Sequence, residues 1–368
     1  MNEDCLKVTT YFGERDRENG RYLADELLDL FERNALQASI LLRGAEGFGI
    51  KHRLQTQRLL SLSEDLPLVA IGVDSRSRVE PIIDEIRQRF HNGLLTVERS
   101  RMLTGRIGAV ELPHDLHEAT KLTIYCGRAE RVYGKSAAGA IVDLLQRQGV
   151  TGATVFLGVD GMTHGLRQRA RFFSRNVDVP LMIVSVGTGD TVTEALPKIG
   201  SLLDRPLFTL ESIRVLKRDG EQLADLDHVP ERDEEGLQLW QKLMIYASEQ
   251  ARFNGHGHPL YVELIRRLRQ TNASGATALR GIWGYHGDHR PHGDRLFSLR
   301  RHVPVVTVII DRPEEIQRLW PIVDQATSAT GLVTSELVPA FRAAAAGVEH
   351  GRLKLAQHTR KHHPRPPA

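Results

Sequence analysis

The pattern of apolar and polar positions recurs three times along the chain. Each copy opens with a strand-like apolar segment that ends at a tyrosine (residues 8–11, 122–125 and 243–246). A glycine follows nine residues later, and further on come a GxxG and an arginine-apolar-apolar-serine unit. A proline stands nine residues after that arginine in every copy. Self-similarity kept in register over such a distance indicates a triplication.

Each copy carries the periodicities of the same elements. The first strand leads into an amphipathic helix, and a second strand follows at residues 39–42, 154–157 and 277–279. A third strand, rich in β-branched residues, begins at the proline. These prolines are Pro67, Pro180 and Pro304.

The second helix and the last strand show the clearest repeat. The helix has apolar residues at i, i+3, i+4 and i+7: Val79, Ile82, Ile83 and Ile86; Val192, Ala195, Leu196 and Ile199; Ile316, Leu319, Trp320 and Val323. The strand carries Thr-x-Glu: Thr96 and Glu98, Thr209 and Glu211, Thr334 and Glu336. Strand–helix–strand–strand–helix–strand is the order of the ferredoxin-like unit. We therefore predict an α+β fold of three tandem ferredoxin-like (βαββαβ) domains.

The repeats and the segments between them divide the chain into six parts. We predict repeats at 5–103, 120–218 and 239–347, a linker at 104–119, an acidic linker at 219–238 and a basic, disordered tail at 348–368.

Composition narrows the class of protein. The 368 residues are 41% hydrophobic and 26% charged, with a net charge of +3, too small for a protein that coats nucleic acid. No apolar run is long enough to span a bilayer, and the acidic start is unlike a signal peptide. Two cysteines without a CxxC argue against a disulfide framework or a zinc site. We expect a cytoplasmic protein without specific nucleic-acid binding.

The second copy carries a family resemblance. The segments TIYCGRAERVYGKSAAGAIVDLLQRQGVTGATVFLGVDGM and RFFSRNVDVPLMIVSVG resemble the domain of unknown function 190, the UPF0166 family. That family is similar to the PII signalling proteins, which are trimers of ferredoxin-like subunits. The resemblance implies that one chain supplies all three subunits as an intrachain pseudo-trimer, with no obligate trimer of chains. The strands support this, since they are apolar at nearly every position and need cover on both faces.

The resemblance also implies small-ligand clefts between neighbouring repeats, under the loop that follows each GxxG. Glycines there allow close approach of the backbone and can form an anion nest, although a plain turn explains them as well. An arginine beyond each loop is able to clamp a phosphate; an inter-repeat ion pair with Glu98, Glu211 or Glu336 is the alternative. The candidate ligand-binding residues are Gly44, Gly47, Gly49, Arg58, Gly158, Gly161, Arg171, Gly281, Gly284 and Arg295.

The second and third loops differ in their chemistry. The segment between Gly158 and Val179 contains four arginines and only two aspartates, which favours an anionic ligand in the second repeat. The third loop has His286, His289 and His292 at intervals of three, a candidate set for a transition metal. A solvated histidine-rich loop is the default interpretation.

No catalytic motif stands out, so we expect a non-catalytic regulator. The resemblance implies that it binds a small anionic ligand, with an adenine nucleotide as a candidate, and modulates a partner such as a membrane transporter of the fluoride-channel type. The modified tyrosine and the glycine-lysine loop of nitrogen-regulatory PII proteins are missing here, so the cofactor stays open. A metal-binding homeostasis protein similar to CutA, using the third-repeat histidines, is the alternative.

Overall fold

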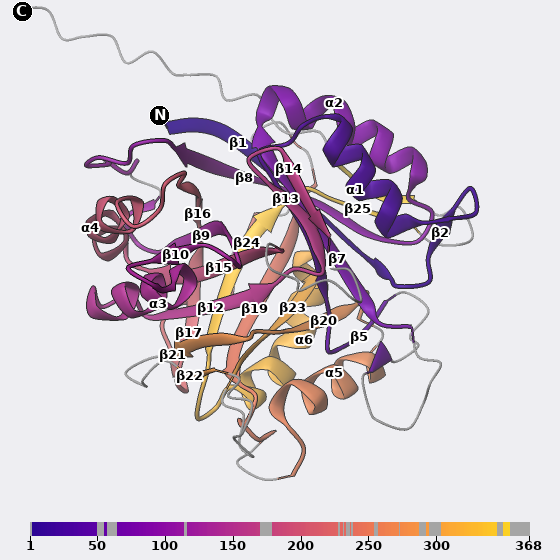
Figure 1. Ribbon diagram of the computed structural model, residues 1–368. Coiled ribbons are helices and arrows are strands. Elements are labelled where there is room, and N and C mark those ends of the chain that lie inside the picture. Colours follow the sequence, from indigo (N-terminus) through magenta and orange to yellow (C-terminus); the bar gives the residue numbers. More distant parts are fainter. Residues whose placement is uncertain are drawn as a thin grey trace, which may run out of the picture.

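The computed structural model describes residues 2–49, 55–56, 65–113, 116–169, 179–226, 229–230, 232, 236, 238–253, 257–271, 273–286, 292–293, 303–343 and 349–353. Within these ranges the chain forms a mixed α/β structure with six helices, and every strand pair is antiparallel. The helices lie in pairs at the periphery, with the strands between them (Figure 1). None of the described helices is long and apolar enough to cross a membrane.

The elements follow the three repeats in order. The first contains β1 (Asn2–Gly13), β2 (Arg17–Glu18), β3 (Arg21–Tyr22), α1 (Leu23–Arg33), β4 (Ala38–Arg43), β5 (Glu46–Phe48), β6 (Gln55–Thr56), β7 (Pro67–Ser75), α2 (Arg76–Arg89) and β8 (Gly93–Thr104). The second contains β9 (Thr120–Gly127), β10 (Arg131–Val132), β11 (Lys135–Ser136), α3 (Ala137–Arg147), β12 (Gly152–Leu157), β13 (Asp160–Thr163), β14 (Leu166–Arg169), β15 (Pro180–Gly187), α4 (Gly189–Gly200), β16 (Leu207–Ser212), β17 (Arg214–Arg218) and β18 (Glu221–Gln222). The third contains β19 (Trp240–Ser248), α5 (Leu260–Gln270), β20 (Ala276–Arg280), β21 (Trp283–His286), β22 (His292–Gly293), β23 (Pro304–Asp311), α6 (Pro313–Ala326), β24 (Leu332–Val338), β25 (Ala340–Ala343) and β26 (Glu349–Arg352).

The long strands of each repeat pair in the same order: β4-β7-β1-β8, β12-β15-β9-β16 and β20-β23-β19-β24. The predicted third strands begin at Pro67, Pro180 and Pro304, as expected. The predicted apolar stripes of the second helices are confirmed as well, since they are buried in α2 and α4, and in α6 except for the partly buried Trp320.

Two sets of strand exchanges join the repeats. The short strand that contains the second glycine of each GxxG pairs with the edge of another repeat: β13 with β4, β21 with β12, and β5 with β20. The end of each repeat also pairs with the last strand of another: β8 with β16, β17 with β24, and β25 with β8. Both sets run in a closed cycle through the three repeats, so each repeat contacts the other two through backbone hydrogen bonds.

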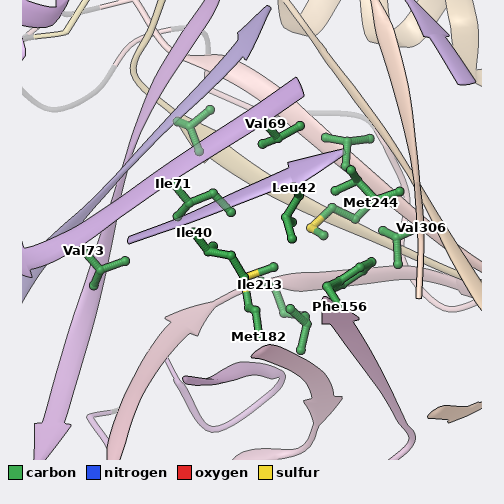
Figure 2. Close-up of a cluster of buried hydrophobic side chains, with 14 of the residues drawn as sticks. Ile40, Leu42, Val69, Ile71, Val73, Phe156, Met182, Ile213, Met244 and Val306 are labelled. Carbon is green, nitrogen blue, oxygen red and sulfur yellow. The ribbon is translucent and has the colours of Figure 1, made fainter. Parts of the chain in front are cut away.

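Each sheet is covered on both faces, as the apolar strands predict. One face packs on the helices of its own repeat, in three separate cores. The other face joins a shared core to which all three repeats contribute, and Figure 2 shows Ile71, Met182, Met244 and Val306 of this core gathered together.

The residue after each GxxG anchors the strand exchange. Met162 of the second repeat is buried in the helix-side core of the first, Tyr285 of the third in that of the second, and Phe48 of the first in that of the third. The three side chains are at most 4% exposed, so each repeat completes the core of a neighbour.

The ordered chain continues into the segment assigned to the tail. Strand β26 pairs with β25, and Leu353 is buried among residues of the first repeat. The basic composition of 348–368 concealed this short strand, because its stability comes from main-chain pairing rather than from an apolar pattern. Residues 354–368 lie outside the described part of the chain.

Candidate functional site

Six buried charges meet where the three repeats adjoin, and we call them the central charge cluster: Lys7, Lys121, Lys242, Glu98, Glu211 and Glu336. Each lysine comes from the first strand of a repeat and each glutamate from its last. The antiparallel register places them opposite each other, as with Lys7 and Glu98 on β1 and β8. All six are no more than 8% exposed.

The lysines link carboxylates of different repeats. Lys7 Nζ lies 2.6 Å from Glu98 Oε2 in its own repeat and 2.5 Å from Glu211 Oε1 in the second. Lys121 Nζ lies 2.5 Å from Glu211 Oε2 and also bonds Glu336 in the third repeat. Lys242 Nζ closes the cycle at 2.9 Å from Glu98 Oε1. The alternation of charges continues from repeat to repeat.

Burial and neighbouring charge oppose each other in setting the pKa values of the central charge cluster. Burial raises the pKa of Glu98, but Lys242, Lys7 and Lys121 lower it more, and the net pKa is below its usual value. The pKa of Glu211 is likewise lowered against burial, chiefly by Lys121 and Lys7. Burial lowers the pKa of Lys7, but Glu211 and Glu98 raise it well above normal. The pKa of Lys121 is lowered, because its burial outweighs its carboxylates.

This arrangement holds the repeats in one relative position. Oxygens of the three carboxylates lie within 4.8 Å of one another, a spacing that suits a metal ion. The three ammonium groups already neutralise them, however, and a cation would have to displace these lysines. Removing one partner of a buried ion pair is strongly destabilising, so these pairs oppose separation of the repeats.

The three lysines are not among the residues predicted from the sequence, although they recur at one position of every repeat. In every copy a lysine stands four residues before the tyrosine that ends the first strand, at Lys7, Lys121 and Lys242. The sequence predicts the glutamates as alternative partners of the loop arginines, whereas the structure pairs them with these lysines. A lysine inside an apolar strand gives no sign in the sequence that it is buried, because a second repeat has to cover it.

The candidate glycines of GxxG lie where one repeat crosses onto another. A Cβ on Gly284 would come within 2.2 Å of Ala153 O, and one on Gly161 within 2.3 Å of Ser39 O. Both have positive φ, 153° and 151°, which other residues rarely adopt. Gly44, Gly47, Gly158 and Gly281 also lie against atoms of a neighbouring repeat, whereas Gly49 has open space. The close approach of strands accounts for the GxxG glycines but not for Gly49, and the ligand role of all seven glycines stays a prediction.

A cleft opens at the junction of the second and third repeats, and we call it the 2/3 cleft. Its volume is about 280 Å³, and its lining includes Thr154 and Val184 of the second repeat and Ser248, Gly284, His286 and Thr330 of the third. The walls are mostly apolar, and none of the described lining residues is Lys, Arg, Asp or Glu. The cleft lies beside the GxxG strand β21, where the sequence analysis expected a ligand site.

Two small residues of the second repeat line this cleft. Counting back from GxxG, Gly152 and Thr154 of the second repeat correspond to Ala38 and Ile40 of the first. At the junction of the first and second repeats, Ile40 Cγ1 lies 2.8 Å from the position of a Cβ on Gly158, and Thr154 Cγ2 lies at the same distance from a Cβ on Gly281.

The predicted arginines divide into two groups. Arg58, Arg171 and Arg295 lie outside the described residues, so their ligand role stays a prediction. Arg167, one of the four arginines of the second loop, bonds three carboxylates: Asp160 Oδ2 at 3.0 Å, Asp29 Oδ1 at 2.6 Å and Glu32 Oε2 at 2.9 Å. Its hydrogen bonds to Asp160, followed by those to Glu32 and Asp29, outweigh burial and raise the pKa of Arg167. Arg167 therefore ties β14 to α1 of the first repeat.

Of the three predicted histidines, only His286 has a side chain within the described part of the structure. His286 Nε2 lies 3.1 Å from Asp219 Oδ1, in the turn between β17 and β18. His289 and the side chain of His292 lie outside the described residues. The metal hypothesis stays a prediction.

Three copies of one domain, joined by reciprocal strand exchange, make this a tandem-repeat protein. The chain belongs to the family DUF190, described as "Uncharacterized ACR, COG1993", whose model matches residues 5–102, 119–215 and 240–340. This confirms the resemblance and the triplication. A UPF0166 protein of Aquifex aeolicus is 36% identical over 94 residues, 26% of this chain and 86% of its own length.

Two further comparisons show lower sequence identity to this chain. A UPF0166 protein of Methanocaldococcus jannaschii is 32% identical over 84 residues, 22% of this chain and 76% of its own length. The crystal structure of aspartate kinase from Synechocystis aligns with 94% of this chain and 46% of that chain, at 9% identity and a TM-score of 0.23. A likeness at that level carries no argument about this protein.

Proposed function

We propose that the three repeats are ferredoxin-like units forming a PII-like pseudo-trimer within one chain. The protein then acts as a non-catalytic regulator that binds a small anionic ligand between repeats and modulates a partner such as a membrane transporter. The strand order common to the repeats and the closed cycle of strand exchanges support the pseudo-trimer.

The 2/3 cleft is the observation that carries the ligand proposal. It lies between two repeats, next to a GxxG strand, and its walls are mostly apolar, with hydroxyl groups from Thr154, Ser248 and Thr330. Small-molecule sites are typically concave and mostly apolar, with a few polar groups that set orientation. The cleft takes the uncharged body of the ligand, and binding of its anionic end by the loop arginines, Arg295 among them, stays a prediction.

The positions and partners of the buried charged groups support a regulator rather than an enzyme. Catalytic sites place perturbed acids and bases at a cavity that a substrate enters. Here Glu98, Glu211 and Lys7, whose pKa values are shifted, bond one another in the central charge cluster, and none of them lines the 2/3 cleft.

Ligand binding is tested by thermal unfolding of the full chain with AMP, ADP, ATP, cyclic dinucleotides, divalent metals and fluoride. A ligand at 100 times its Kd stabilises by about 2.7 kcal/mol. For 368 residues, an unfolding entropy of about 2.1 cal/mol/K per residue converts this into a Tm rise of roughly 3–4 °C.

A cleft-filling variant locates the ligand. Thr154→Ile copies Ile40 of the first repeat and should abolish the Tm rise while the chain still folds. Thr163→Ala, at the junction of the first and second repeats, is the control and should keep it. The cleft assignment fails if the rise persists in Thr154→Ile, and the ligand proposal fails if no compound raises Tm. The partner is tested by binding of a reconstituted fluoride-channel-type transporter with and without the ligand found.

A further inference from the structure

The second repeat carries a short hairpin with a tyrosine at its tip. Strands β10 and β11 are joined by a two-residue turn, Tyr133 and Gly134, and we call this unit the β10–β11 hairpin. Both turn residues have positive φ, 48° and 79°, as the tightest hairpin turns require. Val132 is buried in the helix-side core of the repeat and fixes the base of the hairpin, whereas the tip lies in solvent.

Tyr133 does not suit this position if stability alone is considered. A left-handed conformation is unfavourable for a residue with a Cβ, least so for asparagine and aspartate. The matching tip in the first repeat has Asn19, also at φ of 48°. Tyr133 is 94% exposed, more than any other large apolar side chain that the structure describes, so burial of the ring offsets none of the strain. Because strained residues concentrate at sites of function, we infer that this ring contacts something outside the chain.

The charges around the two tips differ as well. The ten residues 127–136, which contain the β10–β11 hairpin, have three basic side chains and one acidic one. The matching ten residues of the first repeat, 13–22, have three of each. The carboxylate of Glu130, the acidic residue, accepts a hydrogen bond from a main-chain N–H. The three cations are exposed and form no ion pair with any described residue: Arg128, Arg131 and Lys135.

In the first repeat the cation that follows the turn is paired within the chain. Arg21 bonds Glu26 and Asp29, each at 2.6 Å. The second repeat has Lys135 at the position of Arg21, but Ala140 at the position of Glu26. The β10–β11 hairpin therefore presents unpaired positive charge beside an exposed aromatic ring, and the hairpin of the first repeat does not.

We propose that the β10–β11 hairpin docks on an anionic lipid surface, with Tyr133 among the headgroups and Arg128, Arg131 and Lys135 beside their negative charges. Tyrosine is enriched at the membrane–water interface, where its ring and hydroxyl both find suitable surroundings, and each nearby lysine or arginine strengthens binding to an anionic leaflet. A stable protein interface takes about 20–30 residues a side, far more than a two-residue tip with three cations offers. The inference goes beyond the proposed function and does not depend on the ligand of the 2/3 cleft.

Co-sedimentation of the full chain with lipid vesicles tests the contact. Vesicles of phosphatidylserine and phosphatidylcholine should bind the protein more tightly than vesicles of phosphatidylcholine alone, and high salt should weaken the binding. Arg128→Gln with Lys135→Gln should lower the affinity about 10- to 25-fold, at about fivefold for each cation. Arg15→Gln with Arg17→Gln removes two exposed cations from the hairpin of the first repeat and is the control, which should bind as the unaltered protein does.

The role of the tyrosine has its own variants. Tyr133→Asn should lower the affinity at least about threefold, even though asparagine suits the positive φ and stabilises the fold. Tyr133→Trp and Asn19→Trp place an indole at the same position of the two hairpins, and the three native tryptophans give both variants the same background. Phosphatidylserine vesicles should shift the fluorescence emission of Tyr133→Trp to shorter wavelength and leave that of Asn19→Trp unchanged.

The outcomes decide between a lipid surface and other partners. Other basic segments contribute equally to every variant, so the affinity relative to the unaltered protein isolates the hairpin. Absence of binding to phosphatidylserine vesicles, or an equal loss in the control of the first repeat, overturns the proposal. A loss in the charge variant, with no effect of Tyr133→Asn and no emission shift, also overturns it and favours an acidic protein surface. None of these results bears on the thermal unfolding panel, so the proposed function stands or falls separately.

Discussion

Replacing Glu211 with glutamine should destabilise the protein far more than removal of a surface carboxylate. Glu211 lies 2.5 Å from both Lys7 and Lys121, and its side chain is 1% exposed. The change leaves two buried ammonium groups short of a counter-charge, which costs about 3–5 kcal/mol when a buried pair is broken. For 368 residues, that corresponds to a Tm drop of about 4–6 °C.

Equilibrium unfolding in denaturant measures this cost against a matched control. Glu14 pairs with Arg43 at 2.7 Å, but both side chains are at least 36% exposed, so Glu14→Gln should cost less than about 1 kcal/mol. Lys7→Met combined with Glu211→Leu removes one charge of each sign. Lys121 with Glu336 and Lys242 with Glu98 remain as neutral pairs, so this double variant should regain much of the stability.

Two results would refute the reasoning about the central charge cluster. A loss of less than about 1 kcal/mol in Glu211→Gln would mean that water reaches the lysines and screens them. A double variant no more stable than Glu211→Gln would show that packing of the side chains, rather than charge balance, sets the cost.

Four further predictions follow from the same geometry. The folded-state pKa values of Glu98 and Glu211 lie below the unfolded value of roughly 4.3. Their contribution to the free energy of unfolding is therefore present above that pH and lost as the pH falls below it. Denaturant unfolding at pH 7, 4 and 3 should show this loss of stability, and the loss should be smaller in Glu211→Gln. Gly284→Ala should cost about 2–3 kcal/mol, because its Cβ meets Ala153 O, whereas Gly49→Ala, in open space, should change stability little in the same assay. Tyr133 is 94% exposed at φ of 48°, so Tyr133→Asn should raise the unfolding free energy by about 0.5–1 kcal/mol; no gain would show that the ring packs favourably after all. Light scattering should give the 41.3 kDa monomer, and a tight trimer of chains would contradict the pseudo-trimer.

Local sequence determined the elements within each repeat. Apolar periodicity located the helices, and the prolines marked the start of β7, β15 and β23, because these signals depend on neighbours a few residues away. Repetition then identified the family and the number of domains. The glycines of GxxG were recognised as special positions, but not as crossing points, since a turn and a crossing require the same backbone freedom.

Contacts between repeats were decided only by the tertiary structure. Lys121 looks like an ordinary polar residue of a strand until the third repeat brings Glu336 against it, 215 positions away in sequence. Arg167 looked available to a ligand until α1 of the first repeat supplied Asp29 and Glu32. The 2/3 cleft is likewise lined by residues of two repeats, so neither repeat alone contains it. Burial and ion pairing depend on which surfaces meet. The sequence periodicity of one repeat does not indicate which neighbouring repeat covers its surface.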